Sequence, residues 1–390
     1  MMEPAGAGSL LPRAFLRIGG RTLARHQLGL ALDMECQRIV CIAREVGPEL
    51  IALQHEAERA GAQFHVISEI RGLAGLVTAN DELLVVSEGL LVARQVALKL
   101  LEGSHAVLVQ PAETGVAAGF ERIDLNYAAA GLMRIPGRFA EGLFELPADC
   151  NVPSALTRIA LQAGIAMREV PLASREGAHW RMIRDEAEAQ AVERDWIRLH
   201  IAETRASSPS SWLARMGVLT FGPSLLHARN GGQLASRAAV AAIVFALGAG
   251  WLGLIVTGFL LCAIAAVLRQ AARMLRSVEG DGGVHAPPWS GLVAVLGCVL
   301  DLVLILLILW SASFTPWETV PERAFAPVLL LLLVRLVPRV SDRAWTDWVK
   351  DRALLSVVLA IVAGTGTIQE SVQVLTVLLA LGGILIPGRK

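Results

Sequence analysis

The chain has 390 residues, of which 54% are hydrophobic and 18% charged, against about 45–50% and about 25% for an average soluble domain. That excess is typical of a membrane protein. Because 35 basic and 35 acidic side chains cancel, no overall basic field attracts nucleic acid, and we expect no nucleic-acid partner. The cysteines lack disulfide or zinc spacing, and residues 1–8 lack the pattern of a secretory signal peptide.

Residues 1–205 carry charge at the density of a soluble domain and alternate between two kinds of segment. Helix-like stretches cover 49–60 and 91–101, between short apolar runs that favour β-strands. This alternation predicts βαβ units and a mainly parallel sheet. The predicted strands are 37–43, 63–68, 82–87 and 106–110.

In such a sheet, ligands bind beyond the carboxyl ends of the strands. That rule points to three loops, at Gly6–Ser9, Ser87–Gly89 and Pro111. The first belongs to an Ala-Gly-Ala-Gly-Ser segment, and glycines let backbone N–H groups approach a phosphate closely. A small-residue N-terminal tail without a ligand is the alternative interpretation.

A region of different composition begins near residue 235, where long apolar runs alternate with short polar loops. A spanning helix needs about 20 apolar residues, or fewer where flanking side chains snorkel. We therefore predict an all-α, six-helix transmembrane domain over 235–390. The predicted spans are 235–249, 251–270, 290–312, 324–340, 353–367 and 371–387.

A linker over 206–234 joins the two regions. Its stretch Trp212–Leu226 mixes large apolar side chains with Arg215, which favours an interfacial amphipathic segment. Because periodicity does not distinguish the two, a buried helix of the soluble domain is the alternative.

Basic residues predict the orientation of the spans. They gather after the second, fourth and sixth spans, whereas the opposite loops contain only Arg323. By the positive-inside rule, the basic loops face the cytoplasm. We therefore predict a multi-pass protein of the inner (cytoplasmic) membrane with both termini in the cytoplasm.

The order of short motifs in residues 1–205 resembles the Rossmann-like nucleotidyltransferases. The glycine-rich Ala5–Ser9 is followed by Pro12-Arg13, by Ile18–Arg25 and by a strand at Arg38–Ile42. In that family the glycine-rich loop holds a nucleoside triphosphate and a basic residue follows it. The resemblance implies an α/β Rossmann-like cytoplasmic domain that binds CTP. The phosphate-binding residues that it implies are Gly6, Gly8, Ser9 and Arg13.

The same resemblance implies a metal position at Glu88, where the family carries an aspartate after its central strand. Trp180–Ala189 resembles the family's second metal-binding segment, with Met182 and Arg184 in place of its aspartates. Nucleotidyl transfer needs carboxylates that hold Mg²⁺ or Mn²⁺ against the phosphates. Glu88 is therefore the metal ligand predicted in this region.

The membrane region resembles the CDP-alcohol phosphatidyltransferases, in particular the fused enzymes that make inositol-phosphate lipids or soluble inositol phosphodiesters. Their signature, D-x2-D-G-x2-A-R-x8-G-x3-D-x3-D, holds two divalent metals on the CDP diphosphate. Here Gly297-x3-Asp301 matches one glycine and one aspartate, whereas Ile305 replaces the last aspartate. The resemblance implies a metal-binding and catalytic role for Asp301.

Charged residues in the predicted spans have a structural and a functional interpretation. Asp301 lies deep in the third span, where a carboxylate is costly unless paired or hydrated. It is either a remnant of the metal or headgroup site or part of a structural ion pair. Arg269, Arg273 and Arg276 either fix the topology or bind a lipid phosphate or nucleotide diphosphate, and we assign Arg273 and Arg276 to phosphate binding. Arg335 either snorkels or binds phosphate.

Two functions follow from these patterns. The first is a membrane transferase of polar-lipid headgroup metabolism with altered metal sites, which uses CTP or a CDP-alcohol and acts on a membrane lipid. The alternative is a non-catalytic scaffold or regulatory partner of an intact lipid-synthesis enzyme, which the loss of carboxylates favours. By resemblance to the family, we also expect homodimerisation through the membrane helices.

Overall fold

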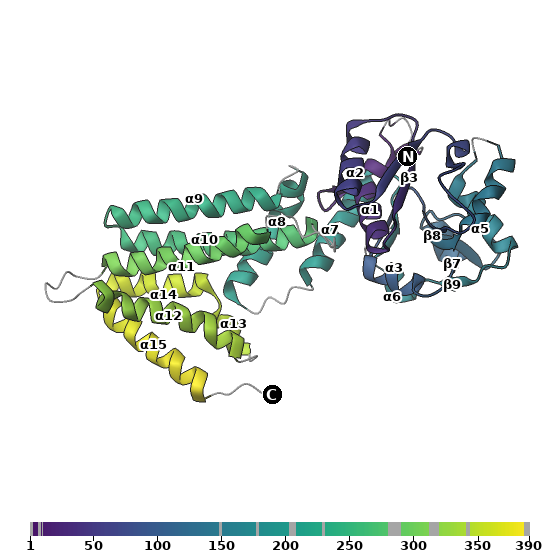
Figure 1. Ribbon diagram of the computed structural model, residues 1–390. Coiled ribbons are helices and arrows are strands. Elements are labelled where there is room, and N and C mark those ends of the chain that lie inside the picture. Colours follow the sequence, from purple (N-terminus) through teal and green to yellow (C-terminus); the bar gives the residue numbers. More distant parts are fainter. Residues whose placement is uncertain are drawn as a thin grey trace. The chain divides into compact units, whose positions relative to one another are not determined.

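The computed structural model of the chain (Figure 1) describes residues 3–385 except for 7–8, 10, 148–149, 177–178, 203–207, 228–230, 280–289, 312–319 and 341–343. Two compact units form, one mainly from the first 199 residues and one from the residues beyond them. The first unit is α/β and the second is helical.

Two sheets form the framework of the first unit. β3 (Arg38–Ile42) pairs in parallel with β4 (Gln63–Ile67). The second sheet has the strand order β5-β8-β7-β9. Its strands are β5 (Glu82–Val86), β8 (Tyr127–Pro136), β7 (Ala106–Pro111) and β9 (Met167–Glu169). Because β8 is antiparallel to β5 and β7 while β7 and β9 are parallel, this sheet is mixed.

The four predicted strands are present as β3, β4, β5 and β7. The prediction of a mainly parallel sheet was wrong, because β8 enters between β5 and β7 and runs against both. Residues 128–131 of β8 are alanine and glycine, which have low β propensity, so no strand was predicted there. The predicted helix 91–101 is shorter than expected, because Leu90–Val92 forms β6 and α3 begins at Arg94.

Among the described residues, two short antiparallel pairs and seven helices complete the first region. β1 (Arg17–Ile18) pairs with β2 (Arg21–Thr22), and β6 (Leu90–Val92) with β10 (Trp180–Met182). The helices are α1 (Leu23–Asp33), α2 (Pro48–Arg59), α3 (Arg94–Leu101), α4 (Ala112–Ala117), α5 (Val152–Gln162), α6 (Leu172–Arg175) and α7 (Glu186–Ala202). Short 3-10 helices cover Arg13–Phe15, Ile70–Leu73 and Gly137–Glu145.

A buried ion pair ties α1 to α3. Arg94 Nη1 lies 2.7 Å from Asp33 Oδ2, and both side chains are at most 10% exposed. Gly29 of α1 faces this pair, because a Cβ built on it would lie 1.7 Å from Arg94 Nη2. The glycine therefore leaves the space that the guanidinium occupies.

The helical unit contains a helix at each of the six predicted spans. Its helices are α8 (Pro209–His227), α9 (Gly231–Trp251), α10 (Ile255–Glu279), α11 (Ser290–Ser311), α12 (Val320–Val340), α13 (Ala344–Val349), α14 (Arg352–Thr365) and α15 (Ile368–Leu385). Within the described residues, two stretches are long and apolar enough to cross a membrane, Gly232–Trp251 and Ile255–Arg276.

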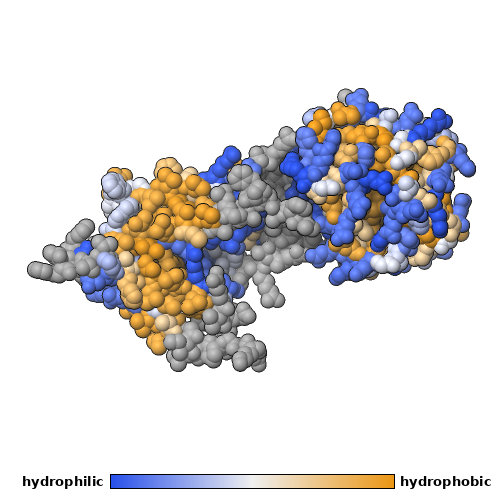
Figure 2. All heavy atoms as spheres, in the orientation of Figure 1, coloured by the Kyte–Doolittle hydropathy of each residue, from blue (hydrophilic) through white to orange (hydrophobic). Residues whose placement is uncertain are grey.

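The surface of the helical unit is largely apolar on the face that Figure 2 shows. Phe245, Phe325 and Ile361 are each more than 60% exposed, although they lie on three different helices. Soluble monomers rarely expose contiguous apolar patches of more than a few hundred square ångströms. The surface and the two candidate spans together indicate association with a membrane.

The segment predicted to lie at the membrane interface forms α8, which packs against α10 and α14. Ala214 and Val218 are buried, whereas Trp212 and Phe221 are more than half exposed. α8 belongs to the helical unit, so the alternative of a buried helix in the soluble domain was wrong.

We expect Gly29→Ala to lower the free energy of unfolding by about 3 kcal/mol, because displacing the Arg94 guanidinium leaves Asp33 buried and unpaired. In an Arg94→Met background, the Cβ of an alanine at position 29 no longer meets a guanidinium group. There, Gly29→Ala should raise the free energy of unfolding by roughly 0.5–1 kcal/mol, because alanine has a higher helix propensity than glycine. Urea unfolding of both backgrounds measures this difference. An equal cost in the two backgrounds would contradict the steric account.

Candidate functional sites

The N-terminal glycine-rich loop closes on itself. Pro4 and Pro12 form an antiparallel bridge, and Gly6 has a φ of +87°. The N–H of Gly6 donates to the Pro4 carbonyl at 3.0 Å, and that of Ser9 to the Gly6 carbonyl at 3.3 Å. The Ser9 hydroxyl accepts from the Leu11 N–H at 3.1 Å. The sequence analysis predicted that Gly6 and Ser9 bind phosphate. In the structure, these residues instead form hydrogen bonds within the loop itself.

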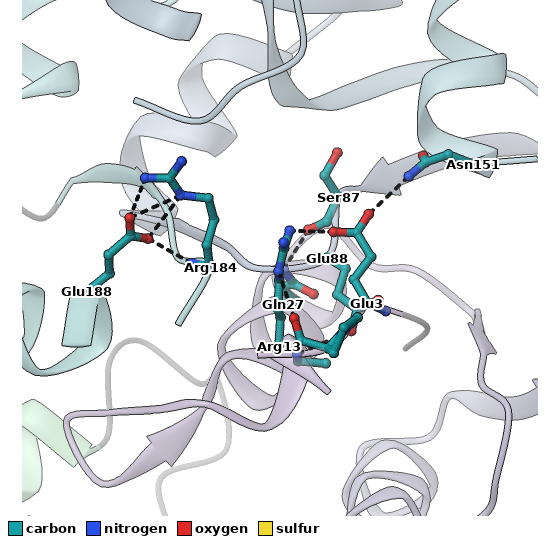
Figure 3. Close-up of polar contacts among 10 residues, drawn as sticks. Glu3, Arg13, Gln27, Ser87, Glu88, Asn151, Arg184 and Glu188 are labelled. Carbon is teal, nitrogen blue, oxygen red and sulfur yellow. Dashed lines mark hydrogen bonds and ion pairs between the residues drawn. The ribbon is translucent and has the colours of Figure 1, made fainter. Parts of the chain in front are cut away.

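Glu88, the predicted metal ligand, holds both ends of this loop. Its Oε2 accepts from the Glu3 N–H at 3.1 Å, and its Oε1 from the Ala14 N–H at 3.3 Å (Figure 3). Arg13 donates from Nε to the Pro4 carbonyl at 3.2 Å and forms an ion pair with Glu3. The structure thus brings together Gly6, Ser9, Arg13 and Glu88, while Gly8 lies outside the described residues.

Arg184 occupies the segment where the nucleotidyltransferases carry metal-binding aspartates. Its Nε lies 3.0 Å from Oε1 of Glu188, and this hydrogen bond raises the pKa of the guanidinium. Figure 3 shows this pair in the same view as the Glu88 network. The carboxylate of Glu188 therefore binds a protein cation at this position.

A cavity of about 910 Å³ lies in the first unit and is lined by β3, β5 and the residues around Glu88. At one end, Arg38 Nη2 lies 2.9 Å from Asp81 Oδ2. Cys41 also lines the cavity, and burial raises the pKa of its thiol to about 11. The thiol is therefore protonated near neutral pH and is a poor nucleophile.

Asp301 is buried in the helical unit, with 6% of its surface exposed. Arg352, the first residue of α14, places Nε 2.7 Å from Oδ1, and Arg335 of α12 places Nε 2.7 Å from Oδ2. A cation at a helix N-terminus opposes the helix dipole. The negative charge of Asp301 therefore offsets two free-energy costs of Arg352. One is the cost of burying its charge, and the other is the cost of placing a cation at a helix N-terminus.

Gly297 makes room for a third arginine one turn before Asp301. A Cβ built on Gly297 would lie 2.7 Å from Nη1 of Arg269 in α10. In the described part of the chain, the buried Nε of Arg269 has no hydrogen-bond partner. Arg269, Arg335 and Arg352 thus gather around one carboxylate, and we call these three residues the arginine cluster.

The two arginines predicted to bind phosphate lie further along α10. Arg273 hydrogen bonds with Gln270 and lies within electrostatic range of Arg269. Arg276 donates to the Ser236 hydroxyl of α9 at 2.5 Å. They extend the positive charge of the cluster along α10.

The surroundings of Asp301 do not fit a divalent cation. Mg²⁺ or Mn²⁺ needs several oxygen ligands, whereas both carboxylate oxygens of Asp301 accept from arginines. Among the described residues, no three His, Cys, Asp or Glu side chains gather closely enough to hold a metal. Planar guanidinium groups suit an anion, above all a phosphate, to which they can donate two parallel hydrogen bonds.

Sequence reasoning missed the role of Arg352 as a partner of Asp301, whereas phosphate binding by Arg269 was one of its two interpretations. It assigned Arg352 to membrane topology because a basic residue near the end of a span has that common role. A signal was available, since a lone carboxylate deep in an apolar helix requires a cation. Arg352 is the first residue of a neighbouring helix and was one of the few candidates for that cation.

Comparison with known proteins finds no family model that matches the chain and no curated protein that matches it. The chemistry of these sites therefore rests on their own residues.

We expect Asp301→Asn to destabilise the helical unit by about 3–5 kcal/mol, because it leaves the buried Arg352 without its counter-charge. Asp347→Asn is the matched control, since Asp347 forms an exposed pair with Lys350 at 3.4 Å and should cost at most about 1 kcal/mol. Thermal unfolding in detergent compares the two variants. Equal midpoints would contradict a stabilising role for the Asp301 carboxylate.

A pH-dependent prediction concerns Asp81, whose pKa is lowered first by the hydrogen bond from the Thr78 N–H and further by Arg38. Because its folded pKa lies below its unfolded value of about 3.9, its stabilising effect is present above that value and is lost as the pH falls through the folded pKa. We expect Asp81→Asn to be less stable than the parent at pH 7. In urea unfolding, the difference in unfolding free energy between the parent and Asp81→Asn should shrink below about pH 4. A difference that stays constant with pH would contradict the lowered pKa of Asp81.

Proposed function

We propose that this chain is a membrane protein of polar-lipid headgroup metabolism that binds a phosphate-bearing headgroup or its CDP-linked precursor. In this proposal it acts as a non-catalytic partner of a lipid-synthesis enzyme. The observation that carries the proposal is the arginine cluster, in which three guanidinium groups gather around one buried carboxylate.

Charge and hydrogen bonding support an anionic ligand. Excess positive charge is costly in apolar surroundings unless an anion offsets it. The buried Nε of Arg269 is a donor that a phosphate oxygen can satisfy. A lipid headgroup is a suitable source of that phosphate, because its acyl chains match the apolar surface of the helical unit.

The same proposal includes a six-span arrangement in the cytoplasmic membrane. α9 and α10 contain the two candidate spans, and α11, α12, α14 and α15 coincide with the remaining predicted spans. The basic residues that follow α10 and α12 favour a cytoplasmic position for those loops and for both termini.

The contacts of two carboxylates favour the non-catalytic role over a transferase. Glu88 accepts from two backbone N–H groups, and Asp301 accepts from two arginines. A transferase would have to free these carboxylates before either could hold a metal.

The second candidate function is a transferase that uses CTP or a CDP-alcohol. The arginine cluster favours this candidate, because its positive charge can offset the negative charge of a diphosphate.

A binding experiment on the full chain in nanodiscs tests the ligand class. Phosphatidylcholine discs that contain CDP-diacylglycerol or phosphatidylglycerol are compared with phosphatidylcholine discs alone, by native mass spectrometry of the bound lipid. We expect Arg269→Gln to weaken binding of the anionic lipid about tenfold, the loss of one charge-assisted hydrogen bond. Arg237→Gln on the exposed side of α9 is the matched control. Equal affinity of the parent and Arg269→Gln would contradict the proposal.

An activity measurement separates the two candidate roles. The full chain is incubated with CDP-diacylglycerol, a phosphorylated polyol and Mg²⁺ or Mn²⁺, and released CMP is measured. We expect no release above the control without protein. CMP release by the parent chain that requires Mg²⁺ or Mn²⁺ would favour the transferase over the non-catalytic partner.

A further inference from the structure

The turn between α9 and α10 exposes large apolar side chains. Trp251 is 80% exposed, and Leu252 and Leu254 are each more than half exposed. The turn itself is tight, because Gly253 has a φ of +79° and the Leu254 N–H donates to the Ala249 carbonyl at 2.8 Å. Apolar surface of this extent is costly in water. These side chains therefore fit an apolar environment outside the protein.

Trp310, near the end of α11, lies beside Trp251. The two ring centroids are 6.2 Å apart and the ring planes meet at 79°, which is an edge-to-face arrangement. Gly250 makes room for this approach, because a Cβ built on it would lie 2.4 Å from Leu307 Cδ2 and 2.8 Å from Trp310 Cε3. The close packing of α11 against the turn thus places two indole rings at one end of the helical unit.

The backbone at this end requires polar surroundings. The last C=O groups of α9 and the first N–H groups of α10, which begins at Ile255, have no partner within their own helix. Bonds within the turn use the carbonyls of Gly248, Ala249 and Gly250. The other groups need water or lipid headgroups, because hydrocarbon offers no hydrogen-bond partner. A polar backbone with apolar side chains suits the boundary between hydrocarbon and headgroups.

The length of the hairpin indicates where the other boundary lies. α9 and α10 run side by side (Figure 1), and Arg276 near the end of α10 donates to Ser236 near the start of α9. At 1.5 Å per residue, the 20-residue span Gly232–Trp251 covers about 30 Å, the thickness of the hydrocarbon core of a bilayer. With Trp251 at one boundary, Arg276 therefore lies at the other, where phosphate and water surround a guanidinium group.

We propose that Trp251 and Trp310 form an interfacial anchor, which binds the headgroup region of a phospholipid bilayer at the end of the helical unit opposite Arg276. Tryptophan suits this boundary because its ring is apolar while its indole N–H can donate to lipid carbonyls and phosphates. The anchor fixes the depth of the α9–α10 hairpin in the bilayer. This inference rests on the proposed membrane-spanning position of α9 and α10, but not on the ligand of the arginine cluster.

Spin-labelled lipids test the depth of the two rings. The full chain carries 5-fluorotryptophan in phosphatidylcholine nanodiscs with a nitroxide at the lipid headgroup or at the end of an acyl chain, about 15 Å from either boundary. Trp251→Phe and Trp310→Phe assign the two fluorine resonances. We expect both resonances to be lost with the headgroup label and retained with the chain-end label. Greater loss with the chain-end label, or no loss with either label because a second copy covers the rings, would overturn the proposal.

A reporter within α9 separates the anchor from the spanning position on which it rests. Phe245 is exposed and precedes Trp251 by six positions, so it lies about 9 Å nearer the bilayer centre. Phe245→Trp adds a resonance that we expect to be lost with the chain-end label. If Trp251 and Trp310 are lost with that label as well, the anchor is wrong and the span is right. If neither label affects the added resonance, the span is wrong too.

Gly250→Ala tests whether the two rings act as a pair. This change displaces the Trp310 ring, so we expect the fluorine resonances of Trp251 and Trp310 to shift. Gly248→Ala is the matched control, because a Cβ built on Gly248 meets nothing within 4 Å, and it should leave both resonances in place. Identical spectra of the two variants would overturn the pairing of the rings.

Discussion

A carboxylate buried among apolar helices must be neutralised, and in the helical unit this requirement falls on Asp301. Arg352 and Arg335 meet it by binding the two carboxylate oxygens at 2.7 Å, which joins α11, α12 and α14 at one point. Two guanidinium groups already exceed the charge of one carboxylate. Arg269, admitted beside them by Gly297, adds further positive charge and an unused buried donor. In our proposal, the ion pairs that stabilise the helices also prepare a site for an anion.

The first unit uses its carboxylates in a comparable way. Glu88 lies where the nucleotidyltransferase resemblance implies a metal ligand, and it closes the N-terminal loop through backbone N–H groups instead. Asp301 lies where the phosphatidyltransferase resemblance implies a metal ligand, and it binds arginines. In both units the remaining carboxylate stabilises the fold. This common feature is the physical basis for proposing a binding partner rather than a catalyst.

Particular elements show how much the sequence could predict. β3, β4, β5, β7 and the six apolar helices were predicted because each is a continuous apolar run of suitable length. β8 was missed because alanine and glycine carry little strand signal. Gly297 and Asp301 were singled out by their resemblance to the phosphatidyltransferase signature, but the bond between Arg352 and Asp301 joins residues 51 positions apart. Such long-range pairing leaves no local pattern, so the candidate site was predicted only in part.

The central claim is that the arginine cluster binds a phosphate while Asp301 keeps its arginines. A cryo-electron microscopy map of the full chain in nanodiscs that contain CDP-diacylglycerol tests it most directly. We predict phosphate density within hydrogen-bonding distance of Arg269, with the Asp301–Arg352 pair intact. A metal ion on Asp301 with the arginines displaced, or headgroup density away from the cluster, would contradict the account.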